Sequence, residues 1–520
     1  MRRTLIAALM FALSWLNLPL ASAQQIPFLP ELLKGTEEIN QLYMEKKRAG
    51  RDLSAIDPIR ARGEEAFSRG NIPGVLEVLG QSRAALNGRE WNDREKFVSS
   101  LTVDSDRLII EGNVEIQITL MRMFPSSIEK VFPKPPTVTF EIRPIEHRTT
   151  ISQTGSAPSP GSLVISNPIA IAETNTTTRA RAKLVDGAYW VIASIEADGQ
   201  KVAEIKKLVF AIDDFTGRLA EMSKRVESIK NSSDPQVKAV AQYVTTPEFQ
   251  IERLKPLTST RSETEIYPTD QIEEIEAALV ALAKGENPYK DETGEIERAY
   301  RSSDGKLIPY RAYIPESYNG QEARPLVVML HGALGDERTY FSGLYDPMVI
   351  KGEADRRGYI MAAPNGRGRL SGYQGLAQED AFEVIKGIAR DYRIDSNRIY
   401  LTGHSMGGGG TWAVAAGNPD MFAAIAPVAG ALPAQGNATK DILAKLKNIP
   451  TFMAHGKRDL IVPVSRSREM SEAAKKAGLN VTYLEVPEAD HITIVGATFP
   501  AIMDFFEKNT RQATANKPAR

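Results

Sequence analysis

The chain of 520 residues contains no cysteine, which excludes disulfides, thiol nucleophiles and thiolate metal sites. It also has no charge of one sign in excess: 64 lysines and arginines accompany 65 aspartates and glutamates, for a formal net charge of −1. Because such a balance is not suited to neutralising phosphates, we expect no nucleic-acid partner. Histidine is scarce, with five residues, and no His/Asp cluster has ligand spacing, so we expect neither a metal nor a cofactor.

Long apolar runs are missing after the N-terminal segment, so we expect no membrane span in the rest of the chain. At the N-terminus, Arg2 and Arg3 precede a mostly apolar run from Leu5 to Leu20. Ala21-Ser22-Ala23 then forms the small-x-small pattern of a cleavage site. We therefore expect residues 1–23 to be a signal peptide and the protein to be exported, either periplasmic or secreted.

Between residues 24 and 293 the pattern of apolar residues changes twice. Residues 24–100 show apolar residues at helical spacing, and residues 101–215 show short alternating or β-branched runs between turns, which predict a β-sandwich-like domain. Residues 216–293 return to charged helical patterns and end in a linker. A polysaccharide or protein contact through this half stays open beside a spacer role, because no aromatic platform marks a ligand site.

Residues 294–510 alternate strands with helices. The dipeptide Asp304-Gly305 predicts a hairpin turn between the first two strands. Later strands are expected at 326–330, 359–363, 398–402, 424–428, 450–454 and 481–486, and helices at 381–391, 407–418, 465–477 and 498–508. Since most of these strands are apolar on both faces, we predict an α/β fold with a mostly parallel sheet covered by helices on both faces.

A candidate nucleophile lies in Gly403-His404-Ser405-Met406-Gly407, between a predicted strand and a predicted helix. A sharp strand-to-helix turn leaves no room for side chains at the two glycines and lifts the serine hydroxyl above the sheet. The following helix N-terminus favours the negative charge that develops during acyl transfer. We expect Ser405 to be a catalytic nucleophile.

Serine needs a base to accept its proton, and the base should come last in the chain order serine, acid, histidine. His491 follows the last predicted strand and fits that position. The other four histidines are expected to have other roles: His147 lies outside the domain, His404 should point away on the turn, and His331 and His455 should support loops.

The acid that orients the base is expected at Asp459, after the penultimate strand, with Asp490 as the rival because it adjoins the histidine. Adjacent residues rarely present their side chains to each other, which favours Asp459. The oxyanion should be bound by the backbone amides of Ala333, in a glycine-rich loop after an apolar strand, and of Met406, after the nucleophile.

With these motifs in this order, the domain resembles the α/β-hydrolase superfamily over about residues 295–510. The run RIYLTGHSMGGGGTW at 398–412 looks like the polyhydroxybutyrate depolymerase and feruloyl esterase group of secreted esterases, and is also similar to prolyl-oligopeptidase-like peptidases. The resemblance implies the same triad and the same two oxyanion donors. Many polyhydroxybutyrate depolymerases have cysteine after the His-Gly pair, where this chain has Ala333.

These observations predict a serine hydrolase that cleaves small or polymeric carboxylic esters through an acyl-serine intermediate. Two alternatives stay open: a serine peptidase, which would use the same residues, and a non-catalytic binding protein. The loop from Asn365 to Gly375 is expected to be a solvated surface loop; if it borders the pocket instead, Arg367, Arg369 and Tyr373 would meet the substrate.

Overall fold

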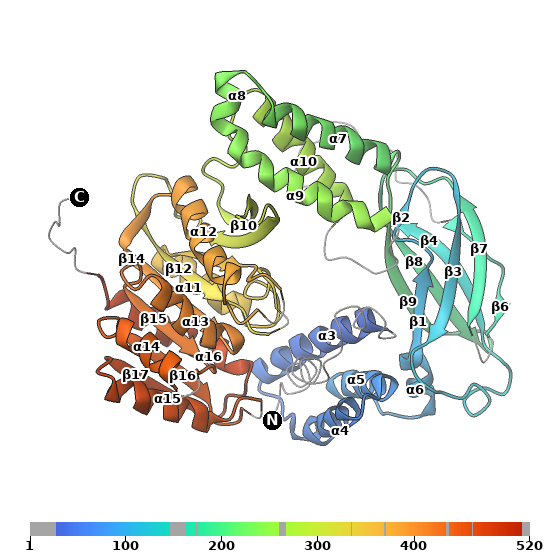
Figure 1. The fold of residues 1–520 in the computed structure, drawn as a ribbon. Coiled ribbons are helices and arrows are strands. Elements are labelled where there is room, and N and C mark those ends of the chain that lie inside the picture. The colour runs from blue at the N-terminus through green and yellow to red at the C-terminus, as the bar shows by residue number, and fades with distance from the viewer. Residues whose placement is uncertain are drawn as a thin grey trace. The chain divides into compact units, whose positions relative to one another are not determined.

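The structure is a computed structural model that describes residues 28–145, 163–171, 175–258, 267–333, 335–368, 371–432, 436–459 and 461–511. The chain divides between Pro288 and Tyr289 into two compact units, which are coloured in sequence order in Figure 1. The expected signal peptide and His147 lie outside the described residues. Among the helices that are described, none combines the length and apolar character needed to traverse a bilayer.

The N-terminal unit has helices at both of its ends in sequence. Asn71 accepts a hydrogen bond from the amide of Gly74 and so caps one of these helices at its start. The described helices are α3 (Leu29–Arg48), α4 (Asp57–Ser68), α5 (Ile72–Leu86), α6 (Asp93–Ser100), α7 (Phe215–Lys230), α8 (Pro235–Val240), α9 (Thr245–Leu254) and α10 (Pro268–Ala283), with short 3-10 turns at Ser54–Ile56, Ala241–Val244 and Lys255–Thr258.

Between these helices lie two sheets. The smaller is antiparallel, in the order β1 (Leu101–Ser105), β3 (Val114–Arg122) and β7 (Thr176–Ala182). The larger has the order β2 (Ile109–Ile110), β9 (Gln200–Ala211), β8 (Gly187–Ala197), β4 (Thr137–Pro144) and β5 (Leu163–Val164), with β6 (Ile169–Ala170) also paired to β4. Alternate residues of both sheets, such as Ile118 and Phe140, enter one apolar cluster. The β-sandwich-like classification of residues 101–215 stays a prediction.

The C-terminal unit is built on one sheet of eight strands. Its order is β10 (Gly294–Arg301), β11 (Leu307–Ile314), β13 (Ile360–Pro364), β12 (Arg324–Leu330), β14 (Ile394–His404), β15 (Ala424–Val428), β16 (Thr451–Gly456) and β17 (Val481–Val486). The first two strands form the expected antiparallel hairpin. The six strands from β12 to β17 pair with one another in parallel. Parallel strands place their carboxyl ends, and the loops that follow them, at one edge.

Helices cover both faces of this sheet, as Figure 1 shows. Along β12, Leu326 and Val328 face one cluster and Val327 and Met329 face the other, as the two-residue period of a strand requires. The first face packs against α12 (Leu376–Asp391), α13 (Met406–Gly417), α14 (Asn437–Lys445) and α15 (Val464–Lys476), and the second against α11 (Pro347–Arg357) and α16 (Thr493–Glu507). The predicted α/β class is confirmed for this unit.

Residues 289–293, which we assigned to the preceding linker, belong to the C-terminal unit. The hydroxyl of Tyr392 donates to the carbonyl of Glu292 over 2.9 Å. The guanidinium of Arg298 lies 4.0 Å from the ring centroid of Tyr289. These contacts attach the segment to the sheet and explain why the unit begins before residue 294.

Candidate active site

Ser405 lies on the turn between β14 and α13. Its φ of 55° and ψ of −114° are in a region that side chains rarely adopt, which is the strained geometry of a nucleophile elbow. A Cβ on Gly403 would overlap the carbonyl of Gly407, and a Cβ on Gly407 would overlap the carbonyl of Leu330. The two flanking glycines are therefore required by close backbone approach, as the motif suggested.

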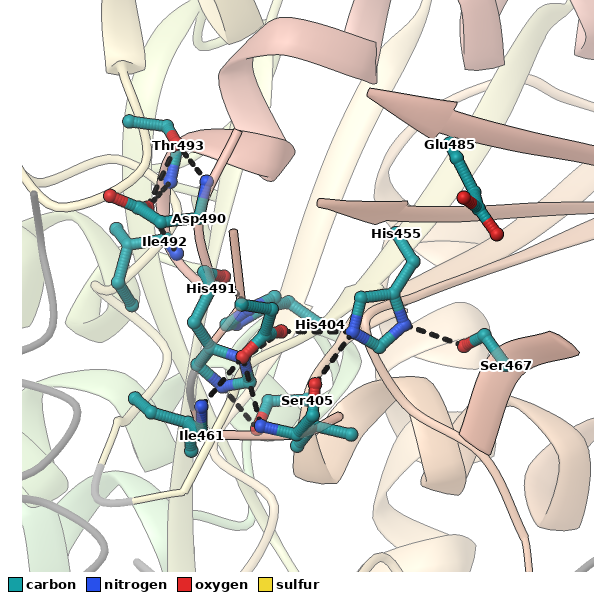
Figure 2. Close-up of polar contacts among 12 residues, drawn as sticks. His404, Ser405, His455, Ile461, Ser467, Glu485, Asp490, His491, Ile492 and Thr493 are labelled. Atoms are coloured by element: carbon teal, nitrogen blue, oxygen red, sulfur yellow. Dashed lines mark hydrogen bonds and ion pairs between the residues drawn. The ribbon is translucent and has the colours of Figure 1, made fainter. Parts of the chain in front are cut away.

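The structure brings Ser405, His491 and Asp459 into one hydrogen-bonded line, of which Ser405 and His491 are labelled in Figure 2. The Oγ of Ser405 lies 2.9 Å from Nε2 of His491, and Nδ1 of His491 lies 2.7 Å from Oδ2 of Asp459. His491 and Asp459 are buried, whereas Ser405 is partly exposed. With Nδ1–H donating to the carboxylate, Nε2 is left unprotonated and able to accept the serine proton.

The carboxylate of Asp459 accepts hydrogen bonds on both oxygens. Oδ1 accepts from the amides of Ile461 at 2.9 Å and Val462 at 2.8 Å, and Oδ2 accepts from the rings of His491 and His455. Burial alone would raise the pKa of Asp459, but the hydrogen bonds from the two histidines outweigh it and hold the pKa well below its usual range. The acid is therefore charged and fixed in orientation.

His455 contacts the candidate triad, which sequence reasoning did not foresee. Its Nε2 lies 3.0 Å from Oδ2 of Asp459 and 2.9 Å from the carbonyl of Val462, and its Nδ1 lies 2.7 Å from Oγ of Ser467. We expected it only to support a loop, which it also does. The spacing of four residues between His455 and Asp459, across a tight turn, is the signal that could have indicated the contact.

His404 points away from the nucleophile, as expected of its position on the elbow. Its ring is fully buried, with Nδ1 at 2.6 Å from the hydroxyl of Tyr345 and Nε2 at 2.6 Å from the main-chain carbonyl of His491. Burial, together with the nearby charge of His491, lowers the pKa of His404 well below its ordinary value. Its ring is therefore neutral at physiological pH.

The rival acid, Asp490, turns toward α16 instead of toward a histidine ring. Its Oδ1 accepts from the amide of Ile492 at 3.0 Å and from the amide and hydroxyl of Thr493 at 2.8 Å each (Figure 2). These bonds satisfy free amides at the start of the helix. The geometry favours Asp459 as the partner of His491.

The two expected oxyanion donors lie in the turn after Ser405 and in the loop after β12. Met406 is the first residue of α13, where an amide has no partner within its own helix. Ala333 follows Gly332, and a Cβ built on that glycine would lie 3.4 Å from Cβ of Ser405. The loop after β12 therefore approaches the nucleophile closely. Their role as oxyanion donors stays a prediction.

The loop at 365–375 corrects one sequence-based expectation. Arg367 forms ion pairs with Asp380 and Asp304 and a hydrogen bond with Ser302, so its charge is already neutralised within the domain. Tyr373 is fully buried, with its ring 5.5 Å from that of His331. Neither side chain is free to meet a substrate, and Arg369 lies outside the described residues.

Comparison with known proteins adds a family model described as PET hydrolase-like, which matches residues 361–503. A bifunctional acetylxylan esterase/xylanase of Neocallimastix patriciarum is 28% identical over 31% of this chain and 22% of its own length. A probable feruloyl esterase C of Aspergillus oryzae is 26% identical over 34% of this chain and 65% of its own. A cutinase of Thermobifida alba is 35% identical over 19% of this chain and 31% of its own. The chain thus spans less than two thirds of each relative.

Solved structures of esterases are also similar. A thermostable esterase superimposes with a TM-score of 0.38 at 17% identity, covering 78% of this chain and all of the other. The feruloyl esterase module of Clostridium thermocellum superimposes with a TM-score of 0.35 at 18% identity, covering 43% of this chain and 91% of the other.

Proposed function

We propose that this chain hydrolyses carboxylic esters by way of an acyl-serine intermediate. The proposal proceeds from the α/β-hydrolase superfamily as the family of residues 289–511. The observation that carries the proposal is the line of hydrogen bonds from the buried Asp459 and His491 to the partly exposed Ser405. It leaves Nε2 of His491 as the acceptor of the serine proton and supplies a charged partner for the imidazolium that results.

In the proposed reaction, Oγ of Ser405 forms a bond to the ester carbonyl carbon while His491 accepts the hydroxyl proton. The amides of Ala333 and Met406 stabilise the oxyanion, and loss of one such donor typically costs about 10²- to 10³-fold in rate. Collapse of the intermediate breaks the bond to the alcohol, which leaves with the proton from His491. Water then attacks the acyl-serine, with His491 as base, and releases the acid and the free serine.

For the substrate, we propose esters of acetyl, feruloyl or polyester type. This is supported by the names of the relatives, which include acetylxylan esterase, feruloyl esterase and cutinase, and by the PET hydrolase-like family model. Such substrates share a carboxylic ester whose alcohol is a better leaving group than an amine. A peptidase function would use the same residues, so the experiment includes an amide.

The test is steady-state hydrolysis of p-nitrophenyl esters from acetyl to dodecanoyl, methyl ferulate and a peptide p-nitroanilide. We expect the full-length wild-type protein to cleave esters and Ser405→Ala to lose several orders of magnitude in kcat, up to about 10⁶-fold. Covalent labelling by a fluorophosphonate, detected by intact mass, should map to the peptide that contains Ser405.

Three other outcomes would contradict the proposal. Turnover of the anilide alone would replace the esterase proposal by a peptidase. Full ester turnover by Ser405→Ala would remove the proposed nucleophile. No turnover and no labelling of the wild-type protein, with the fold intact by circular dichroism, would favour a binding protein.

We further propose that the protein is exported after removal of residues 1–23, on the strength of the charge, apolar run and cleavage pattern of that segment. N-terminal sequencing of the protein from its native producer should begin at Gln24, whereas retention of Met1 would contradict export by this route. For the N-terminal half, a polysaccharide or protein contact remains the proposal, and pull-down on insoluble xylan is its simplest check.

A further inference from the structure

Two buried side chains beside the candidate triad have no part in the proposed chemistry. Tyr345 and His404 are each about 1% exposed, and their ring centroids lie 4.9 Å apart. The hydroxyl of Tyr345 lies 2.6 Å from Nδ1 of His404 and 3.2 Å from the amide nitrogen of Gly332. The other ring nitrogen of His404 lies 2.6 Å from the carbonyl oxygen of His491. These contacts form one continuous chain.

The two ends of the chain fix the direction of every hydrogen bond in it. A main-chain carbonyl can only accept, so Nε2 of His404 carries a proton and donates it to His491. In the neutral ring Nδ1 is then an acceptor, and the hydroxyl of Tyr345 donates to it. A main-chain amide can only donate, so the N–H of Gly332 donates to the tyrosine oxygen. Each group has one role, and all three bonds are made together.

The chain of hydrogen bonds connects two parts of the candidate active site. One end is the amide next to Ala333, the proposed oxyanion donor, and the other is the main chain of His491, the proposed base. The middle is the residue that precedes Ser405. A Cβ on Gly332 would lie 2.8 Å from the hydroxyl of Tyr345 and 3.0 Å from Nδ1 of His404, so the loop is pressed against this pair.

We propose that Tyr345 and His404 are positioning residues for the hydrolytic reaction: their hydrogen bonds hold the oxyanion loop and the backbone of the base in fixed relation around Ser405. The inference rests on the proposed function. Because reaction rates respond steeply to displacements of about 1 Å at reacting groups, loss of the connection should affect the chemical step more than substrate binding.

The chain offers a matched control. Tyr340 is also about 1% exposed, its ring packs 4.9 Å from that of Tyr345, and its hydroxyl donates to the carbonyl of Leu330 over 3.2 Å. The Tyr340 hydroxyl also meets the backbone amide of His404, so Tyr340→Phe removes the same atom equally close to the nucleophile but leaves the side-chain connection from Gly332 through Tyr345 and His404 to His491 in place. A purely structural role would give the two phenylalanine variants the same phenotype.

The experiment compares kcat and KM of full-length wild type, Tyr345→Phe and Tyr340→Phe on p-nitrophenyl butyrate. We expect Tyr345→Phe to lose about 10- to 100-fold in kcat with KM changed less than about threefold, and Tyr340→Phe to stay within about threefold in both. His404→Gln, which keeps an Nε2–H donor, should retain at least about tenfold more kcat than His404→Leu. Equal kcat for the two phenylalanine variants, or for the two His404 variants, would overturn the proposal.

A measurement without turnover keeps this inference separate from the proposed function. In Ser405→Ala labelled with ¹⁵N-histidine, the ring nitrogens of His404 should show the neutral Nε2–H tautomer, and Tyr345→Phe should shift the Nδ1 signal. An Nδ1–H tautomer would refute the chain. If wild type hydrolyses no ester, the proposed function fails; if it is active and Tyr345→Phe matches Tyr340→Phe, only this inference fails.

Discussion

The change Asp459→Asn tests the assigned acid most directly, because each oxygen of the carboxylate has two donors facing it. Ile461 and Val462 donate from their amides to Oδ1, and His491 and His455 donate from their rings to Oδ2. An asparagine has one oxygen and one NH₂ group. The backbone amides cannot become acceptors, so the asparagine oxygen must face them and its NH₂ group must face the two histidines.

This orientation has a calculable consequence for the base. Facing an NH₂ donor, Nδ1 of His491 must become an acceptor, so the proton moves to Nε2, which then cannot accept the proton of Ser405. In the serine-protease triad the same change of tautomer costs about 10⁴-fold in kcat. A loss of that size corresponds to about 5 kcal/mol of transition-state stabilisation. We expect it in kcat with little change in KM, because the substrate does not touch the acid.

Asp490→Asn is the matched control for this measurement. The hydrogen bonds described for the Asp490 carboxylate come from the amides of Ile492 and Thr493 and the hydroxyl of Thr493, none of them in the candidate triad. The substitution should therefore cost about 1 kcal/mol of stability and leave kcat within about threefold. Steady-state kinetics on p-nitrophenyl butyrate and urea denaturation give both values. The reverse pattern, or a loss below about tenfold in Asp459→Asn, would refute the assignment of Asp459.

Three further predictions concern neighbouring groups. Activity should fall on acidification with the slope of a single proton in log kcat/KM against pH, because the lowered pKa of Asp459 keeps that carboxylate ionised and so contributes no second proton; a slope of two would contradict this. His455→Phe should cost about 2 kcal/mol of unfolding free energy and about tenfold in kcat, with His455→Gln retaining most of both. Because the folded-state pKa of Asp459 is lowered, its stabilisation is present above about pH 4 and lost as pH falls through the folded-state value, so the stability deficit of His455→Phe should shrink in acid. Gly407→Ala should abolish folding or cost at least about 3 kcal/mol in urea denaturation, since its Cβ would overlap the carbonyl of Leu330.

The sheet of the C-terminal unit could be predicted because its strands are apolar on both faces. The expected strand at 326–330 lies within β12, and the expected run at 424–428 coincides with β15. Helices with a weak apolar pattern were missed: α11 (Pro347–Arg357) buries only Ile350 and Ala354 through its hydrophobic side chains. A helix that contributes two apolar residues to a core gives almost no periodic signal.

The pairing of strands in the N-terminal unit was beyond sequence reasoning for a different reason. Residues 114–120 pair with residues 176–182, and residues 137–144 pair with residues 189–196. Alternation within a strand shows which side chains share a face, but it does not indicate a partner about 60 residues away. Register is decided by which faces fit together in the folded core, and that information is absent from any single run.

The four described histidines of the C-terminal unit show what decides between a structural and a catalytic role. His331 follows β12, His404 ends β14 and His455 lies near the end of β16, so all three stand at the carboxyl edge of the sheet. Each has a ring nitrogen within 2.9 Å of a main-chain carbonyl, so each ring attaches to a loop through the main chain.

His491 differs from His331 and His404 in the partners of both ring nitrogens: its Nδ1 contacts the carboxylate of Asp459, its Nε2 contacts the hydroxyl of Ser405, and neither bond is to a main-chain carbonyl. His455 also lies between Asp459 and a serine hydroxyl, but its Nε2 additionally faces the carbonyl of Val462, and its serine, Ser467, is buried. A ring whose proton faces a carbonyl cannot give up that tautomer without losing a buried hydrogen bond, whereas a ring between an acid and a hydroxyl can accept a proton and stay fully bonded. Chain order selected His491 from sequence, and the partners of its two nitrogens supply the chemical reason why that histidine, and not its neighbours, is suited to move a proton.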